Sequence, residues 1–128
     1  MKKTVLAFSG LSQHLKDKLN AQFNLLTVNP KAGNLKAQFA QLLPQAEGMI
    51  GVGRKLDKEI LQHGHQLKVV SSISVGYDNY DLDYLNKHGI ILTNTPDVLT
   101  QTTADLAFAL LMSSARRVVE LDKWTKQG

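Results

Sequence analysis

Short apolar runs alternate with helix-like segments along the whole chain, and this alternation restricts the fold more than any other feature. Between the first two runs, Leu15, Leu19 and Phe23 recur every fourth residue, as the inward-facing residues of a helix do. Parallel strands are typically joined by single crossover helices, so we predict an α/β domain with a flavodoxin-like, doubly wound parallel sheet. The strands are expected at Thr4–Ser9, Asn24–Val28, Gly48–Val52, Lys68–Ile73 and Ile90–Thr93.

Polar residues that can cap helices stand where the connecting helices should begin. Ser12, Asn34 and Asp81 are predicted N-caps, and Asp57 should open a helical turn. Gly89 is expected to end the helix that Asp81 begins, because glycine readily adopts the backbone conformation found after a helix.

The last part of the chain has no residue that would interrupt a helix. Nothing breaks a helical pattern from Gln101 to about Lys126, and Thr100 can cap it. The sequence therefore predicts a flavodoxin-like domain over residues 1–100, followed by one long C-terminal helix over residues 101–128.

The composition excludes several classes of function. The chain contains no Cys, so disulfides, thiolate catalysis and Cys-based zinc sites are excluded. The net charge of +4 comes from basic residues scattered along the sequence, whereas nucleic-acid binders concentrate them, so no nucleic-acid partner is expected. The apolar run in MKKTVLAFSG is too short for a signal peptide, and no run is long enough to span a membrane. We therefore expect no membrane partner and a cytoplasmic location.

The segments that follow the third, fourth and fifth expected strands are the candidate ligand-binding loops. Ligands of open parallel sheets bind beyond the carboxyl ends of the strands. In SVGYDN, Gly76 and its neighbours can present several amide N–H groups to one anion, because glycine accepts backbone angles that a Cβ forbids. The alternative is a tight turn in which Asp78 and Asn79 bond nearby amides.

The loop GVGRKLD does not complete a dinucleotide-binding motif. Leu56 stands where the third glycine of G-x-G-x-x-G should be. Arg54 could pair with an anion through two hydrogen bonds, or it could be an ordinary exposed arginine.

Other polar clusters are better explained as structural. His63 and His65 lack a third metal ligand, and the acidic residues of the SVGYDN segment and the helix after it lack the late Glu of a calcium loop, so no metal site is predicted. The start of the last helix has two interpretations: its residues cap the helix, or they contact a phosphate-bearing ligand. The acidic residues are Asp78, Asp81 and Asp83. The residues at the start of the last helix are Thr100, Thr102, Thr103 and Asp105.

Residues 69–118 carry three motifs: S-x-G-Y-D-N, N-T-P-x-V-L-T-x-T-T-A-D and A-R-R-V. With these motifs the sequence resembles the D-isomer-specific 2-hydroxyacid dehydrogenases, and among them most closely the bacterial glyoxylate/hydroxypyruvate reductases, also called 2-ketogluconate reductases. Residues 1–68 fit the same family more loosely.

The resemblance implies an enzyme that transfers hydride from NADPH or NADH to a small 2-oxo acid. It implies that the amides of Val75 and Gly76 hold the substrate carboxylate, and that Val52, Gly53 and Arg54 border the substrate pocket. It places Thr103 near the nicotinamide of the cofactor. These six positions are the predicted substrate-binding and cofactor-binding residues.

The chain departs from the family in length. Family members are more than twice as long, and their nucleotide domain and catalytic arginine, glutamate and histidine follow the position of residue 128. We therefore expect this chain alone to lack turnover. Leu106–Met112 is apolar nearly all round, so this segment is expected to be buried on more than one side. The resemblance implies a homodimer formed through helix 101–127.

Two other functions stay open on the sequence. One is a stand-alone flavodoxin-like module that binds a flavin or another small ligand without catalysis. The other is a structural protein that dimerises through helix 101–127.

Overall fold

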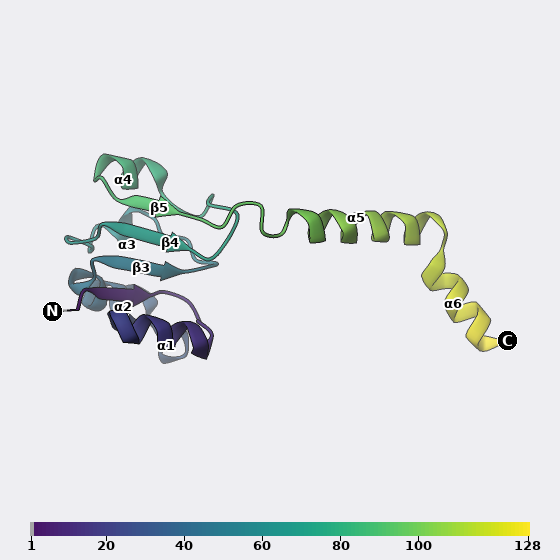
Figure 1. Cartoon of the computed structure of the whole chain (residues 1–128), viewed down its shortest axis with the longest axis horizontal. Coiled ribbons are helices and arrows are strands. Elements are labelled where there is room, and N and C mark those ends of the chain that lie inside the picture. Colours follow the sequence, from purple (N-terminus) through teal and green to yellow (C-terminus); the bar gives the residue numbers. More distant parts are fainter. Residues whose placement is uncertain (1) are drawn as a thin grey trace. The chain divides into compact units, whose positions relative to one another are not determined.

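Five short strands form one parallel sheet in the computed structural model, which describes residues 2–128 (Figure 1). Their order is β2-β1-β3-β4-β5, which is the order of a flavodoxin-like, doubly wound sheet and confirms the predicted fold class. Every predicted run contains a strand, shorter at its ends than expected. The strands are β1 (Thr4–Ala7), β2 (Asn24–Thr27), β3 (Gly48–Gly51), β4 (Val69–Ser72) and β5 (Ile91–Thr93).

The predicted caps begin the connecting helices. The side chains of Ser12, Asn34, Asp57 and Asp81 each accept a hydrogen bond from a first-turn amide, and Gly89 follows the last of these helices with φ of +65°. These helices are α1 (Gln13–Gln22), α2 (Leu35–Leu42), α3 (Lys58–Leu61) and α4 (Leu82–Lys87), with single 3₁₀ turns η1 (Pro30–Ala32) and η2 (Leu43–Gln45).

The hydrophobic core lies on one face of the sheet. Leu6, Met49 and Val70 are aligned across β1, β3 and β4, and all three are buried. Helices α2, α3 and α4 bury side chains in the same cluster of residues. The helix residues concerned are Phe39, Leu61 and Leu85.

An aromatic pair extends this core beneath the carboxyl ends of the strands. Phe8 and Tyr80 pack edge to face, with ring centroids 6.5 Å apart. The Tyr80 hydroxyl donates to Ser72 Oγ at 2.9 Å, and this bond satisfies the buried hydroxyl groups of both residues. Phe8 also lies directly against Gly51, where a Cβ would meet its ring at 2.8 Å.

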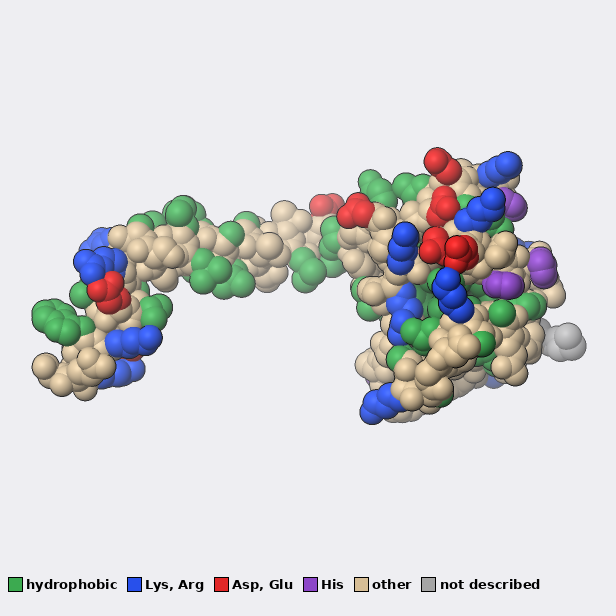
Figure 2. Space-filling model, turned by 180° about the vertical axis from the view of Figure 1, so that it is seen from behind, with side chains coloured by type: hydrophobic (Ala, Val, Ile, Leu, Met, Phe, Trp, Pro, Cys, Tyr) green, Lys and Arg blue, Asp and Glu red, His purple; other side chains and the backbone are tan. Residues whose placement is uncertain are grey.

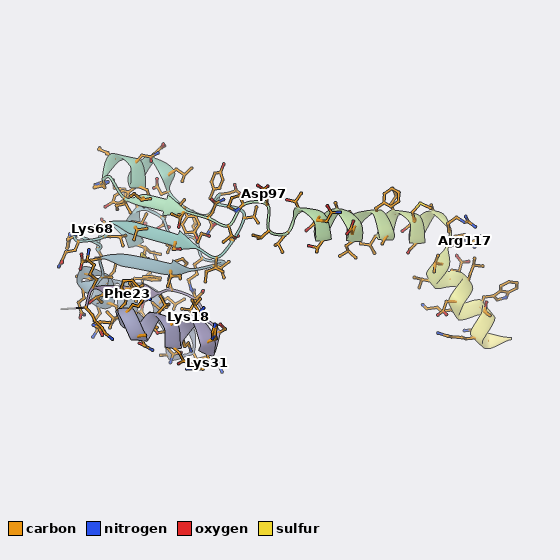
Figure 3. The ribbon with its side chains drawn as sticks, in the orientation of Figure 1. Lys18, Phe23, Lys31, Lys68, Asp97 and Arg117 are labelled. Carbon is orange, nitrogen blue, oxygen red and sulfur yellow. The ribbon has the colours of Figure 1, made fainter. Side chains whose placement is uncertain are left out.

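Residues from Pro96 onward form a second compact unit, and here one prediction is wrong. Two helices, α5 (Thr100–Ala115) and α6 (Val118–Gln127), replace the single expected helix. Arg117 lies between them (Figure 3) with φ of 53°, a left-handed conformation that cannot continue a right-handed helix. Its guanidinium pairs with Glu120. No Gly or Pro marks this break, so the pattern contained no signal for it.

The start of α5 also differs from expectation. Leu99, not Thr100, occupies the N-cap position, and no side chain caps the helix. Thr102 Oγ1 instead donates to the Leu99 carbonyl oxygen at 3.2 Å. Among residues 2–128, no helix is both long and apolar enough to cross a membrane.

Replacing Gly51 with Ala should destabilise the first unit, because the new Cβ would overlap the Phe8 ring. We expect Gly51→Ala to lower the free energy of unfolding by about 1–3 kcal/mol, the usual cost of overpacking. Urea denaturation followed by circular dichroism measures it. Gly10→Ala is the matched control, because a methyl group added there would have no atom within 4 Å. Equal effects of the two substitutions would contradict this account of the Phe8 contact.

Candidate functional site

The loops after β1 and β3 are joined by two hydrogen bonds at the carboxyl edge of the sheet. Arg54 Nε donates to the Phe8 carbonyl oxygen at 2.7 Å. The Val52 amide donates to Ser9 Oγ at 3.0 Å. The loop that contains Val52, Gly53 and Arg54 is thereby held against the end of β1.

The loop after β4 is held on both sides through its carbonyl oxygens and side chains. Asn79 Nδ2 donates to the Arg54 carbonyl oxygen, and the Leu56 amide donates to the Asn79 carbonyl oxygen at 2.9 Å. On the β5 side, Asn94 Nδ2 donates to the Val75 carbonyl oxygen at 2.8 Å. Thr95 makes a similar bond from its amide to the Ser74 carbonyl oxygen at 2.9 Å.

The amides of Val75 and Gly76 remain free while these carbonyl oxygens are bonded. Within residues 2–128, no hydrogen bond uses either N–H group as a donor. Val75 is 38% exposed and Gly76 is exposed as well. Polar backbone groups without a protein partner must bond to water or to a ligand, so this loop offers two donors to an anion.

Gly76 has a different role from the one expected. Its φ is not positive, and a Cβ at this position would have only Asp78 Oδ2 near it, at 4.0 Å. The expectation that the backbone angles here forbid a Cβ is therefore wrong. The missing side chain leaves open space beside the two free amides. Gly53 is the glycine of these loops that does need positive φ, at +72°.

Arg54 is a fixed residue and not a freely exposed one. It is half-buried, and its Nε bond to the Phe8 carbonyl oxygen holds the guanidinium in place. In the described part of the chain, its two terminal nitrogens donate to no protein acceptor. A guanidinium whose terminal nitrogens are free can bind a carboxylate through two parallel bonds.

The residues present do not form a dinucleotide site. Leu56, in the position of the third glycine, is fully buried and makes a parallel bridge to Tyr80. Helix α3, which follows this loop, has four residues, too few to present the N-terminus that holds a pyrophosphate. Thr103, the predicted cofactor contact, is exposed on α5 in the second unit.

Among residues 2–95, neither the histidines nor the ion pairs involve residues of these loops. His63 is half-buried and His65 exposed after α3, and residues 2–128 contain no group of three His, Asp or Glu that could hold a metal ion. At the amino edge of the sheet, a hydrogen bond from Lys68 (Figure 3) lowers the pKa of Glu47 from its ordinary value. This ion pair lies at the opposite edge from the candidate loops. The fixed cation at the carboxyl edge is Arg54.

Two of the residues that hold these loops, Ser9 and Asn94, were missed in the sequence, and Asn79 was considered only as a turn residue. Ser9, Asn79 and Asn94 orient the candidate loops through side-chain bonds to the backbone. The Asn at the end of S-x-G-Y-D-N was available as a signal, because Asn often bonds loop backbone. Ser9 and Asn94 acquire their roles only when neighbouring strands bring their loops together.

Comparisons with known proteins agree with this architecture. The sequence model of the D-isomer specific 2-hydroxyacid dehydrogenase catalytic domain matches residues 5–121. The chain is 42% identical over its full length to glyoxylate/hydroxypyruvate reductase B of Erwinia tasmaniensis and 41% identical to that of Yersinia enterocolitica. It spans 40% and 39% of the lengths of these two relatives.

Solved structures of 2-hydroxyacid dehydrogenases are also similar to this chain. A 2-hydroxyacid dehydrogenase from Ketogulonicigenium vulgare is 26% identical, with a TM-score of 0.84 over 99% of this chain and 40% of that one. An NADPH-dependent glyoxylate/hydroxypyruvate reductase from Sinorhizobium meliloti, solved with NADP and malonate, is 25% identical, with a TM-score of 0.76 over 100% of this chain and 39% of that one. The chain belongs to the D-isomer specific 2-hydroxyacid dehydrogenase family.

Proposed function

We propose that the first unit binds the carboxylate of a small 2-oxo acid, such as glyoxylate or hydroxypyruvate, as part of an NAD(P)H-dependent reductase that forms D-2-hydroxy acids. The observation that carries this proposal is the pair of free amides at Val75 and Gly76. Family membership and the similarity to glyoxylate/hydroxypyruvate reductases support the substrate class.

The proposed binding mode divides the work between backbone and side chain. A carboxylate accepts hydrogen bonds at both oxygens, and the two amides offer donors that cost no side-chain ordering. Arg54 contributes the positive charge, and its Nε bond to Phe8 fixes where that charge lies. Val52 and Val75, each 38% exposed, provide apolar surface that limits the size of the acid. Together these groups bind and orient the acid, and they perform no proton transfer.

We infer that the groups needed for the reduction itself lie outside the loops of this unit. The buried Leu56 stands where a dinucleotide motif has its third glycine, so we assign no step through NAD(P)H to these loops. The relatives are more than twice as long as the chain. We infer that the cofactor site and the acid–base groups of the complete reaction lie in sequence equivalent to that additional length.

A titration with glyoxylate tests the carboxylate site. We expect the backbone amide signals of Val75 and Gly76 to shift most in ¹H–¹⁵N NMR spectra, because these N–H groups would donate to the ligand. Malonate should shift the same signals. Glycolaldehyde, which is similar in size but uncharged, is the control and should leave them in place. Shifts confined to other loops would contradict the site.

Removing one amide should weaken binding. Gly76→Pro deletes the N–H group, whereas Gly76→Ala keeps it and adds a methyl group that meets only Asp78 at 4.0 Å. Hydrogen bonds to charged groups contribute about 1.5–3 kcal/mol, so Gly76→Pro should raise the glyoxylate Kd roughly ten- to a hundredfold in the NMR titration. Gly76→Ala should bind nearly as the parent does. If the two variants bind equally well, the amide is not a ligand.

Arg54 should contribute through its charge. We expect Arg54→Ala to raise the glyoxylate Kd at least about tenfold, because each hydrogen bond between charged groups contributes about 1.5–3 kcal/mol. Lys55→Ala is the matched control, because it removes an adjacent exposed cation outside the proposed site. Comparable losses in both variants would mean that general electrostatic attraction, and not a placed guanidinium, holds the acid.

The protein of residues 1–128 should show no turnover with glyoxylate and NADPH. The reason is that no residue of its loops is assigned hydride or proton transfer. The absorbance of NADPH measures turnover, with a glyoxylate/hydroxypyruvate reductase such as that of Sinorhizobium meliloti as the positive control. Turnover by mass-verified protein would show that the chain contains catalytic groups that this assignment lacks.

A further inference from the structure

Strand β5 forms one edge of the sheet (Figure 1), and its outer backbone groups face no further strand among residues 2–128. On its inner side it pairs with β4, where the Ile91 amide donates to the Lys68 carbonyl oxygen at 2.9 Å. Successive residues of a strand direct their N–H and C=O groups to opposite sides, so those of Leu92 are directed away from β4. The edge therefore offers one donor and one acceptor to an added backbone.

The side chains of β5 do not protect this edge. Proteins commonly protect an edge strand with charged side chains, proline or a bulge. The three residues of β5 include no charge and no proline, and the strand keeps a regular register with β4. Ile91 is 64% exposed, so its side chain adds apolar surface along the edge. The short length of β5 limits a pairing partner to a segment of a few residues.

A pocket of about 590 Å³ lies beside the same edge. Ile91 and Leu92 both line it, so the outward backbone groups and the pocket belong to one surface. Tyr77 and Leu82, which are 48% and 38% exposed, provide further apolar lining. None of the described residues that line this pocket has a charged side chain. Its size lies within the range of pockets that hold ligands.

Helix α4 presents a neutral side to this pocket. Leu82, Asn86 and Gly89 follow one another at spacings of four and three, and all three line it. Figure 2 shows acidic and basic side chains together on another side of the first unit. There the charged residues of α4 and its cap line a second pocket: Asp81, Asp83 and Lys87. Because burying an unpaired charge is costly, the pocket beside β5 favours an uncharged occupant.

We propose that a short, uncharged, extended peptide segment of another protein binds here by adding a strand to the β5 edge. The Leu92 amide donates to a carbonyl oxygen of the segment, and the Leu92 carbonyl oxygen accepts from one of its amides. Side chains of a strand point alternately to opposite faces, so apolar side chains on alternate residues of the segment enter the pocket. The proposal does not depend on the proposed carboxylate site.

The backbone groups of Leu92 favour a peptide over a small molecule. Apolar walls alone would suit either occupant. An outward N–H and C=O on one residue match the donors and acceptors that recur along an extended backbone. When a strand adds to an edge, main-chain bonds provide affinity, and pockets for alternate side chains provide specificity. The β5 edge and the pocket beside it supply both parts.

A capped peptide, acetyl-Thr-Val-Leu-Val-Thr-amide, tests the edge, because it is uncharged and rich in residues that favour strands. In ¹H–¹⁵N NMR titrations of the protein, we expect the Leu92 amide signal to shift most and its exchange with solvent to slow. The matched control is the same peptide with its three central amides N-methylated, which keeps the side chains but removes the donors. Its Kd should be at least about fivefold higher.

Two lysine substitutions on α4 test the pocket. Asn86→Lys places a charge in the pocket beside β5, whereas Asp83→Lys places the same side chain in the other, charged pocket. Both positions are exposed, so both variants should keep the circular dichroism spectrum of the parent. We expect Asn86→Lys to raise the peptide Kd at least about tenfold, and Asp83→Lys to change it less than about twofold.

Four results would overturn the proposal. The first is a Leu92 amide signal that stays in place at the highest soluble peptide concentration. The second is equal binding of the N-methylated peptide, which would mean that the pocket holds apolar groups without strand addition. The third is an equal effect of Asn86→Lys and Asp83→Lys. The fourth is slowed exchange of the Leu92 amide that increases with protein concentration when no peptide is present, which would assign the edge to pairing between copies.

Discussion

Parallel pairing with right-handed crossovers is the constraint on which the rest of the first unit depends. It sends every strand in the same direction, so the segments after β1, β3, β4 and β5 all begin at one edge of the sheet. It also places three helices on one face and α1 on the other. The position of the candidate binding loops at one edge is thus a consequence of this topology.

The candidate site consists of backbone that has been left free, and the surrounding bonds explain how. Carbonyl oxygens and side chains of the loops bond one another, as Asn79 bonds Arg54 and Asn94 bonds Val75. These bonds fix the loop, while the Val75 and Gly76 amides donate to no group among residues 2–128. A site of this kind needs no reactive side chain, which is consistent with the proposed role of binding an acid for chemistry carried out by other groups.

The contact between Phe8 and Tyr80, below the carboxyl edge of the sheet, connects the stability of the first unit with the geometry of the candidate loops. Phe8 packs against Tyr80 and leaves no room for a side chain at Gly51, while its carbonyl oxygen holds Arg54. Phe8 therefore supports the core and also positions Arg54, whose guanidinium is the fixed cation of these loops. Changes at Phe8 would alter both, so the two properties are best separated through Gly51 and Arg54.

The sequence by itself determined the strands, their order of appearance, the four N-caps and the loops that face the carboxyl edge, because periodicity, caps and glycines act over a few residues. Only the tertiary structure decided that Arg54 is fixed by Phe8, that Gly76 needs no special backbone angle, and that Ser9 and Asn94 hold the loops. It also revealed the left-handed Arg117 that divides α5 from α6. These features depend on contacts between residues far apart in the chain, or on a backbone angle that no Gly or Pro announces, and local patterns contain neither.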